Sequence, residues 1–255
     1  MKYRTCVSIG EKNPKKVKSV LKKALSKSDY AEIRFDFLKI SDIPSVLENN
    51  KKSLSRCVCT LRPKSEGGLF VGKEDERKSI LRLIAEYNPY LLDVEHNTIQ
   101  KDRKFALYLK KSKCKLLISW HDFKKTPNES QLKSRYIKMR KFSDMVKIVT
   151  VAKNVSDVSR LLSLYSIKSK SKTIAFCMGE QGMRPDRVCG ATPRGKQPVR
   201  AVSRRHGTRC RRAINHARKA AFAVRIKRPD TLRAGLALRG LIVVSHVRVS
   251  CIDCV

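Results

Sequence analysis

Short apolar runs rich in β-branched and aromatic residues recur between residues 1 and 183. Seven of these runs are predicted strands, at 3–8, 31–37, 56–61, 90–95, 116–120, 145–151 and 173–178. Most of them are continuously apolar rather than alternating, which is typical of parallel strands that are covered on both faces. We therefore expect seven buried, parallel strands in this part of the chain.

Stretches with the apolar spacing of amphipathic helices lie between the predicted strands. The clearest covers Pro14–Leu25, where Val17 and Leu21 repeat at helical intervals, and others cover 79–87 and 154–165. Strands that alternate with helices indicate parallel pairing through crossover helices. Seven such units fit either a doubly wound sheet or most of a (β/α)8 barrel.

Polar residues at the ends of the predicted strands favour the barrel. The turn after the first strand, around Gly10, lacks the repeated glycines of a dinucleotide-binding fold. Reactive side chains gathered at the carboxyl ends of many strands are typical of the active-site face of a barrel. The residues in or just after strands are Ser8, Glu32, Arg34, Asp36, Arg62, Glu66, Asp93, Glu95, His121, Asp122, Lys147 and 178–180. The predicted fold class is α/β, a (β/α)8 TIM-type barrel.

The composition divides the chain into two regions. Residues 1–183 contain 30 Lys, 10 Arg and 19 acidic residues, whereas residues 184–255 contain 3 Lys, 15 Arg, 3 Asp and no Glu. Phe222 is the only aromatic residue after Met183. We predict a barrel domain over 1–183 and an aberrant, Arg-rich tail over 184–255, which is either a shifted reading frame or fusion or a disordered segment. Re-sequencing of codons 178–190 and an intact mass of the native protein test the shifted frame, and an uninterrupted frame would contradict it.

The bulk properties limit the compartment and the partners. No apolar run approaches the length of a membrane span, and the first ten residues are too polar for a secretory signal, so we expect a cytoplasmic protein with no membrane partner. The nine cysteines are expected to be reduced thiols. A net charge of +36 and the basic clusters at 203–206 and 209–212 predict non-specific attraction to nucleic acid. The single Cys-x-x-Cys at 251–254 would need two more ligands for zinc, and we assign no metal.

Six segments together resemble the type I 3-dehydroquinate dehydratase family of the shikimate pathway. The resemblance covers residues 1–183, in the family's order and at about its spacing. The segments read EIRFD at 32–36, TLRPKSEGG at 60–68, DVE at 93–95, SWHDFKKTP at 119–127, VKI at 146–148 and MGEQG at 178–182.

The resemblance implies a lyase that converts 3-dehydroquinate to 3-dehydroshikimate and water through a Schiff base on Lys147, with no cofactor. Only a primary amine forms the iminium that accepts the electrons of the developing carbanion. Such an amine must be neutral to attack, which a dry pocket favours. Lys147 is one of 33 lysines and stands in an apolar run. The alternative is that Lys147 extends to the barrel rim as a solvated charge.

The same resemblance assigns roles to six further residues. His121 would be the general acid–base, since imidazole titrates in the useful range, and Glu66 would orient it. Alternatively, His121 caps the next helix and Glu66 is a plain loop carboxylate. The implied substrate-binding residues are Ser8, Glu32, Arg34 and Arg62.

Structural ion pairs are the alternative to substrate binding for three of these residues. Arg34 would then pair with Asp36, and Glu32 with Arg62. We expect Asp93 and Glu95 to support the site from behind, and His96 to be an ordinary surface residue.

The resemblance stops after Gly182. Asp186 stands where the family has the arginine that binds the substrate carboxylate, and the Ala-Pro-Gly-Gln lid does not occur. We therefore expect the last βα unit to be missing or replaced by the tail, for which the strand-like stretch 240–249 is the candidate. The alternative function is a catalytically impaired barrel whose basic surface binds polyanions. Family members often form homodimers, which makes a homodimer possible here.

Overall fold

A computed structural model describes residues 4–167, 172–179 and 182, and the backbone of 241–244. Its strands form one sheet in the order β7-β6-β5-β4-β3-β2-β1-β8, and all neighbours are parallel. The strands are β1 (Arg4–Ile9), β2 (Tyr30–Arg34), β3 (Cys57–Thr60), β4 (Leu91–Glu95), β5 (Leu116–His121), β6 (Met145–Val151), β7 (Lys172–Met178) and β8 (Leu241–Val244). The first seven confirm the predicted parallel strands.

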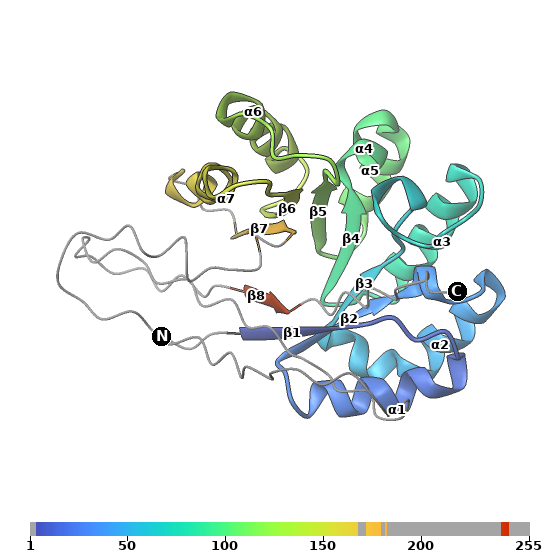
Figure 1. Cartoon of the computed structure of the whole chain (residues 1–255). Helices are drawn as coiled ribbons and strands as arrows, with labels where there is room; N and C mark the ends of the chain where they lie inside the picture. The colour runs from blue at the N-terminus through green and yellow to red at the C-terminus, as the bar shows by residue number, and fades with distance from the viewer. Residues whose placement is uncertain (1–3, 168–171, 180–181, 183–240, 245–255) are drawn as a thin grey trace, which may run out of the picture.

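Helices connect consecutive strands and surround the curled sheet on its outer side (Figure 1). The α-helices are α1 (Pro14–Leu25), α2 (Ile43–Asn50), α3 (Glu74–Glu86), α4 (His96–Lys101), α5 (Arg103–Lys111), α6 (Glu129–Arg140) and α7 (Val155–Leu162). Short 3-10 helices cover Phe35–Phe37, Ile40–Asp42, Lys51–Arg56, Lys64–Glu66 and Ser163–Ser166. No helix in the described part of the chain is long and apolar enough to cross a bilayer.

Local sequence signals account for where several elements begin and end. The side chain of Asn13 accepts a hydrogen bond from the amide of Lys15, and Pro14 stands at the first helical position, so α1 covers the predicted Pro14–Leu25. Asn128 and Gln131 form a capping box that begins α6. The predicted strand at 31–37 is too long, because the chain turns into a 3-10 helix at Phe35.

Two layers of side chains line the inner side of the sheet. Near the beginnings of the strands the inner cluster is apolar and consists of Cys6, Tyr30, Val58, Leu91, Leu117 and Ile174. Because side chains alternate along a strand, the residues two positions further on share this inner side. Most of those are polar, namely Ser8, Glu32, Thr60, Asp93 and Ser119. The fold thus places a layer of polar side chains above an apolar layer on the inner side of the sheet.

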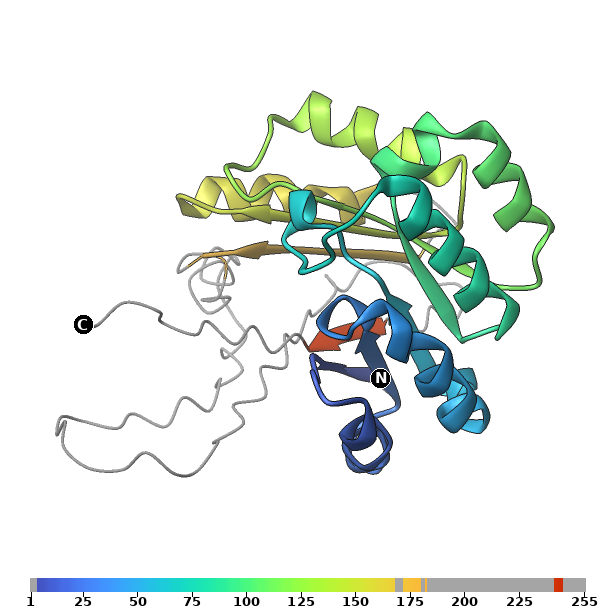
Figure 2. The same ribbon diagram turned by 90° about the vertical axis from the view of Figure 1, so that its right-hand side faces the viewer.

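The curled parallel sheet with helices outside has the arrangement of a TIM-like α/β fold (Figure 2). Within the predicted strand-like stretch 240–249, residues Leu241–Val244 form β8, which pairs with β1 from Arg4↔Leu241 to Val7↔Val244. No hydrogen-bonded ladder joins β7 to β8 within the described residues. The rest of the predicted tail, and residues 180–181 of the MGEQG segment, lie outside the described residues.

Candidate active site

Lys147 lies in the middle of β6 with its side chain inside the curled sheet. The residue is only 7% exposed, so its interpretation as a solvated rim lysine is wrong. Its Nζ lies 3.5 Å from Oδ2 of Asp93 and 3.8 Å from Oε1 of Glu32. The expected dry surroundings are therefore present, but two carboxylates rather than apolar side chains line them.

Glu32 is the buried carboxylate that β2 contributes beside Lys147. Its Oε1 accepts a hydrogen bond of 2.7 Å from Oγ1 of Thr60, and the side chain of Ser8 also bonds to it. Burial alone would raise the pKa of Glu32, but the attraction of Lys147 and Arg34 and the two hydroxyl hydrogen bonds lower it to about 2. Glu32 is consequently a fixed negative charge beside the amine.

His121 ends β5 and is held by Glu66. Its Nδ1 lies 3.0 Å from Oε2 of Glu66, and Nδ2 of Asn97 donates to the other Glu66 oxygen at 3.2 Å. The interpretations of His121 as a helix cap and of Glu66 as an unattached loop carboxylate do not fit this pairing. His121 is on the same side of the sheet as Lys147, because Ser119 lies opposite Lys147 and His121 is two residues further along β5.

The two glycines after Glu66 permit the turn that delivers it. Gly67 has φ +75°, a left-handed conformation in which a side chain would be strained. A Cβ on Gly68 would lie 2.0 Å from the carbonyl oxygen of Arg62, so only glycine allows the chain to pack against that strand end. The backbone turn therefore explains the two glycines of the EGG sequence, and the same turn places Glu66 against His121.

The pKa values of Glu66 and His121 move in opposite directions, and both shifts favour the neutral form. Burial and the neighbouring charge of Glu95 raise the pKa of Glu66 to about 8. Burial and the nearby charges of Arg62 and Lys147 hold the pKa of His121 well below its usual range. The one hydrogen bond between Oε2 of Glu66 and Nδ1 of His121 therefore decides which imidazole nitrogen carries the ring proton.

Arg62 joins several inward-facing polar side chains into one network. The guanidinium of Arg62 donates to Oδ2 of Asp93, Oε1 of Glu95 and Oγ of Ser119, each at 2.6 Å. Arg62 is only 3% exposed. Asp93 therefore bridges Arg62 and Lys147. The predicted supporting position of Glu95 agrees with this geometry, and the alternative direct pair between Glu32 and Arg62 is not among the ion pairs of the described residues.

Arg34 lies at the edge of this network rather than at its centre. Its guanidinium binds both oxygens of Asp36, at 2.8 and 2.7 Å, which confirms the structural pair predicted as the alternative. The side chain of Arg34 is only partly buried, and Asp36 holds it. The structure thus brings together Ser8, Glu32, Arg62, Glu66, His121 and Lys147, with Arg34 beside them.

Arg77 extends the network and was not predicted from the sequence. Its fully buried side chain, from α3, donates to Oε2 of Glu95 at 2.6 Å, to the carbonyl of Leu61 at 3.0 Å and to Glu74. Two arginines therefore hold Glu95 from opposite sides. The signal was available, because Arg77 shares the buried face of α3 with Ile80, Leu81 and Ile84.

Replacing Arg77 with methionine is expected to lower the free energy of unfolding by about 3 kcal/mol or more, because Glu95 would keep a buried charge with half its partners. Urea unfolding followed by circular dichroism measures this. The matched control is Arg82→Met on the same helix, where the arginine only covers Phe105 and Tyr108. We expect the control to change stability by less than about 1 kcal/mol. Equal effects of the two variants would contradict the assigned role of Arg77.

His96 corrects a further expectation. It is fully buried rather than at the surface. Among the described residues, its Nε2 is the one buried side-chain nitrogen or oxygen atom without a hydrogen-bond partner. It stands at the start of α4, on the outer side of the sheet, and packs edge-on against Phe142. In the described part of the chain, no group of three His, Cys, Asp or Glu residues could hold a metal ion.

The described residues supply the parts of an amine-dependent proton transfer. A buried primary amine lies beside two carboxylates, an imidazole is oriented by a third carboxylate, and an arginine network fixes the surrounding polar atoms. An amine in such a place can condense with a ketone, and the imidazole can then move a proton at the neighbouring carbon. The arrangement favours a polar, ketone-bearing small molecule as the substrate.

Comparison with known proteins identifies relatives over the same region. The family model for type I 3-dehydroquinase matches residues 5–192. The chloroplastic bifunctional 3-dehydroquinate dehydratase/shikimate dehydrogenase of Arabidopsis thaliana is 34% identical over 167 residues, which are 64% of this chain and 27% of that protein. The 3-dehydroquinate dehydratase of Methanocaldococcus jannaschii is 30% identical over 181 residues, 69% of this chain and 79% of that enzyme.

Solved structures show the same likeness. A type I 3-dehydroquinate dehydratase from Clostridium difficile, determined with covalently modified comenic acid, superposes with a TM-score of 0.66 at 27% identity. The match covers 74% of this chain and 79% of that one. The 3-dehydroquinate dehydratase from Enterococcus faecalis gives a TM-score of 0.65 at 22% identity and covers 71% and 81% of the two chains, which supports the fold alone.

Proposed function

The chain belongs to the type I 3-dehydroquinase family, and from that premise we propose that it converts 3-dehydroquinate to 3-dehydroshikimate and water in the shikimate pathway. The match to the family model and the dehydratase relatives support this lyase function. The finer proposal concerns the mechanism, in which Lys147 forms a Schiff base and His121 moves the protons.

In the proposed mechanism the Nζ of Lys147 attacks the substrate ketone, and loss of water from the adduct leaves an iminium. Nε2 of His121 takes a proton from the carbon next to the iminium, and the electrons of that C–H bond move into the iminium. The enamine then expels the β-hydroxyl, which leaves as water with the proton that His121 returns. A second water hydrolyses the iminium, which restores the amine and releases the conjugated ketone.

One observation carries the proposal most strongly, namely the buried amine of Lys147 on the strand next to the one that ends in the Glu66-held His121. Asp93 and Glu32 lie 3.5 and 3.8 Å from the amine, so they can hold it in place while it bonds to the substrate. Polar groups around them are suited to a polyhydroxylated acid, since hydroxyls that are buried without partners are costly.

The direct test is an assay of the full chain with 3-dehydroquinate. The product is a conjugated ketone and the substrate is not, so ultraviolet absorbance follows the reaction. The substrate analogue in which a hydroxyl replaces the ketone is the control, because it offers no carbonyl to Lys147. Turnover of 3-dehydroquinate alone supports the proposal, and absence of turnover by correctly folded protein contradicts it.

The pH dependence of kcat/KM should report the pair of Glu66 and His121. Below pH 8 a proton on Glu66 occupies the hydrogen bond to Nδ1, which places the imidazole proton on Nε2 and blocks its use as a base. Ionisation of Glu66 lets Nδ1 carry that proton and frees Nε2. We therefore expect kcat/KM to rise with pH to a plateau above an apparent pKa of about 8 that belongs to the pair.

Two variants separate this effect from general pH sensitivity. Glu66→Gln removes the ionisable group but keeps a hydrogen-bonding side chain, so its kcat/KM should lose the rise near pH 8. Glu48→Gln changes an exposed carboxylate of α2 and should keep the rise. An unchanged profile in Glu66→Gln would refute the assignment to Glu66.

We also propose the finer form of the fold, a (β/α)8 TIM-type barrel whose last βα unit is replaced by the tail 184–255. The seven parallel strands β1–β7 and the placement of β8 beside β1 support it. The absence of the family's arginine and lid from the sequence leaves the substrate carboxylate without those partners. The sequencing and intact-mass measurements described above test the origin of the tail.

A further inference from the structure

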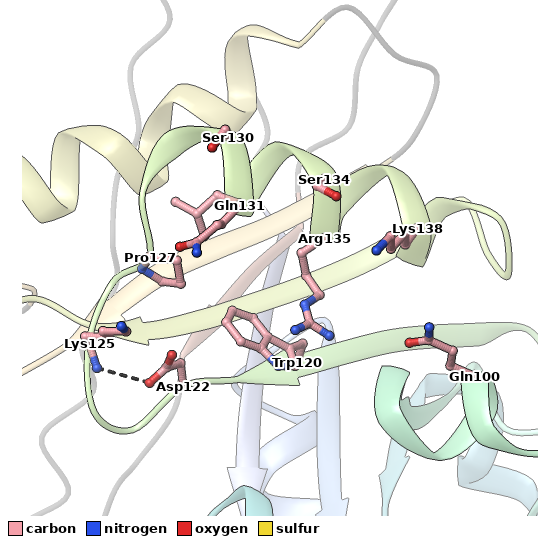
Figure 3. A pocket seen from close by; sticks show the side chains of 11 residues that line it. Gln100, Trp120, Asp122, Lys125, Pro127, Ser130, Gln131, Ser134, Arg135 and Lys138 are labelled. Atoms are coloured by element: carbon pink, nitrogen blue, oxygen red, sulfur yellow. Dashed lines mark hydrogen bonds between the residues drawn. The ribbon is translucent and has the colours of Figure 1, made fainter.

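A hollow of about 740 Å³ lies outside the sheet, between α6, the outer face of β5 and α4 (Figure 3). Trp120 forms its inner wall, and Lys125, Arg135 and Lys138 approach it from the loop after β5 and from α6. Trp120 stands between Ser119 and His121 in sequence, but its side chain points to the opposite side of the strand. The hollow is therefore separate from the site around Lys147.

The three cations of the hollow lack carboxylate partners. None of Lys125, Arg135 and Lys138 takes part in an ion pair between described residues, although many other basic side chains do. Asp122 is the one carboxylate in the lining, and its Oδ1 already accepts hydrogen bonds from the backbone amides of Lys124 and Lys125, at 2.9 and 3.0 Å. The lining thus has an excess of positive charge that the described residues do not neutralise.

The guanidinium of Arg135 has only weak contacts with its neighbours. Its central carbon lies over the ring of Trp120, 4.7 Å from the ring centroid. Its hydrogen bonds to other described residues are long and go to neutral acceptors, Nδ1 of His96 at 3.4 Å and Oδ1 of Asn97 at 3.5 Å. Burial, and then the charges of Arg135 and Lys138, lower the pKa of His96 to about 4, so that imidazole adds no charge.

We propose that this hollow binds a small anion with at least two negative charges, carried by phosphate or carboxylate groups. A guanidinium fork binds either group with two parallel hydrogen bonds, and the ammonium groups of Lys125 and Lys138 add point charges. Ser130, Gln131 and Ser134 supply neutral polar contacts, and Trp120 supplies a flat apolar wall. The volume is that of a small-molecule site, and the cations converge on one concavity rather than forming a strip for a polymer.

Trp120 makes the test direct, because it is the only tryptophan in the chain. Inorganic pyrophosphate and citrate are titrated separately into the full-length protein at constant pH and ionic strength, with chloride as the balancing anion. We expect a saturable change in tryptophan fluorescence. Calorimetry should give the same dissociation constant as the fluorescence titration. Saturation by pyrophosphate alone assigns a phosphate-bearing ligand, and saturation by citrate alone assigns a carboxylate-bearing one.

Matched variants locate the site. Arg135→Gln and Lys138→Gln should each weaken binding by at least about tenfold, since each removes a charged hydrogen-bond donor. Arg82→Gln and Lys133→Gln are the controls. Arg82 also lies over aromatic rings, and Lys133 lies on the same helix as Lys138 but pairs with Glu129. Calorimetry is needed for Arg135→Gln, because that change alters the surroundings of the indole itself.

Three results would overturn the proposal. These are a linear response without saturation for both anions, the same response with chloride alone, or equal weakening by the variants and their controls. None of these measurements requires turnover, so they are independent of the proposed lyase function.

Discussion

Replacing Lys147 with alanine is expected to reduce turnover of 3-dehydroquinate by at least about 10⁴-fold, the scale on which enzymes lose activity without their nucleophile. No other amine among the described residues replaces it beside Glu32 and Asp93, which lie 3.8 and 3.5 Å from its Nζ. Without the amine no iminium forms, and the carbon next to the ketone loses the group that accepts its electrons. Initial rates at saturating substrate measure the effect.

The alanine variant also leaves two buried carboxylates without their cation, so loss of activity must be separated from loss of structure. Lys147→Arg keeps the positive charge but cannot form the iminium, and it should be equally inactive while circular dichroism shows a native spectrum. Lys153→Ala changes an exposed lysine just after β6 and should keep full activity. Substantial turnover by folded Lys147→Arg would contradict the role of Lys147.

Replacing His121 with alanine is expected to separate Schiff-base formation, which should persist, from elimination, which should slow. The amine of Lys147 remains, so the Schiff base should still form and be trapped by borohydride. Proton transfer should slow by about 10²–10⁴-fold, the usual contribution of a positioned acid–base group. Single-turnover kinetics measure the two steps separately, with trapping for the first and absorbance for the second.

The control for this variant is Lys124→Ala, an exposed residue in the loop after β5, which should leave both steps unchanged. Elimination at the normal rate in His121→Ala would show that another group moves the proton. Loss of trapping in the same variant would show instead that His121 is needed to form the Schiff base.

Together these variants describe a site whose interior is polar because of a buried charge network. Asp93 touches both Lys147 and Arg62, Arg62 touches Glu95, and Glu95 touches Arg77. Each contact is between side chains that are almost completely buried. The effects of substitutions at these positions on the free energy of unfolding should therefore not be additive. Arg77 therefore supports the site from the helix layer through its contact with Glu95.

The strands could be predicted from sequence because each is a short apolar run between polar segments, and α1 could be predicted because Asn13 and Pro14 mark its first turn. The end of β2 was harder. Phe35 and Phe37 continue the apolar pattern, but the chain turns there into a 3-10 helix whose phenylalanine ring at position 35 is still fully buried. The apolar pattern therefore indicates which residues are buried, and it does not show where the strand ends.

Individual site residues could be predicted, but their partners could not. The resemblance gave Lys147, His121 and Glu66, and the alternation of side chains placed them on one side of the sheet. Arg62 could equally have paired with Glu32, since Glu32 lies in one predicted strand and Arg62 directly follows the next. Only the packing of β3 against β4 brings it to Asp93 and Glu95 instead. The sequence did not indicate that His96 is buried, because His96 begins a short helix and does not lie in an apolar strand.

The central claim is that the amine of Lys147 bonds covalently to the substrate. The most direct measurement is borohydride reduction of the full-length protein in the presence of 3-dehydroquinate, followed by digestion and mass spectrometry of the peptides. A single stable adduct on the peptide that contains Lys147, absent without substrate, is the predicted result. No adduct, or adducts spread over surface lysines with Lys147 unmodified, would contradict the claim.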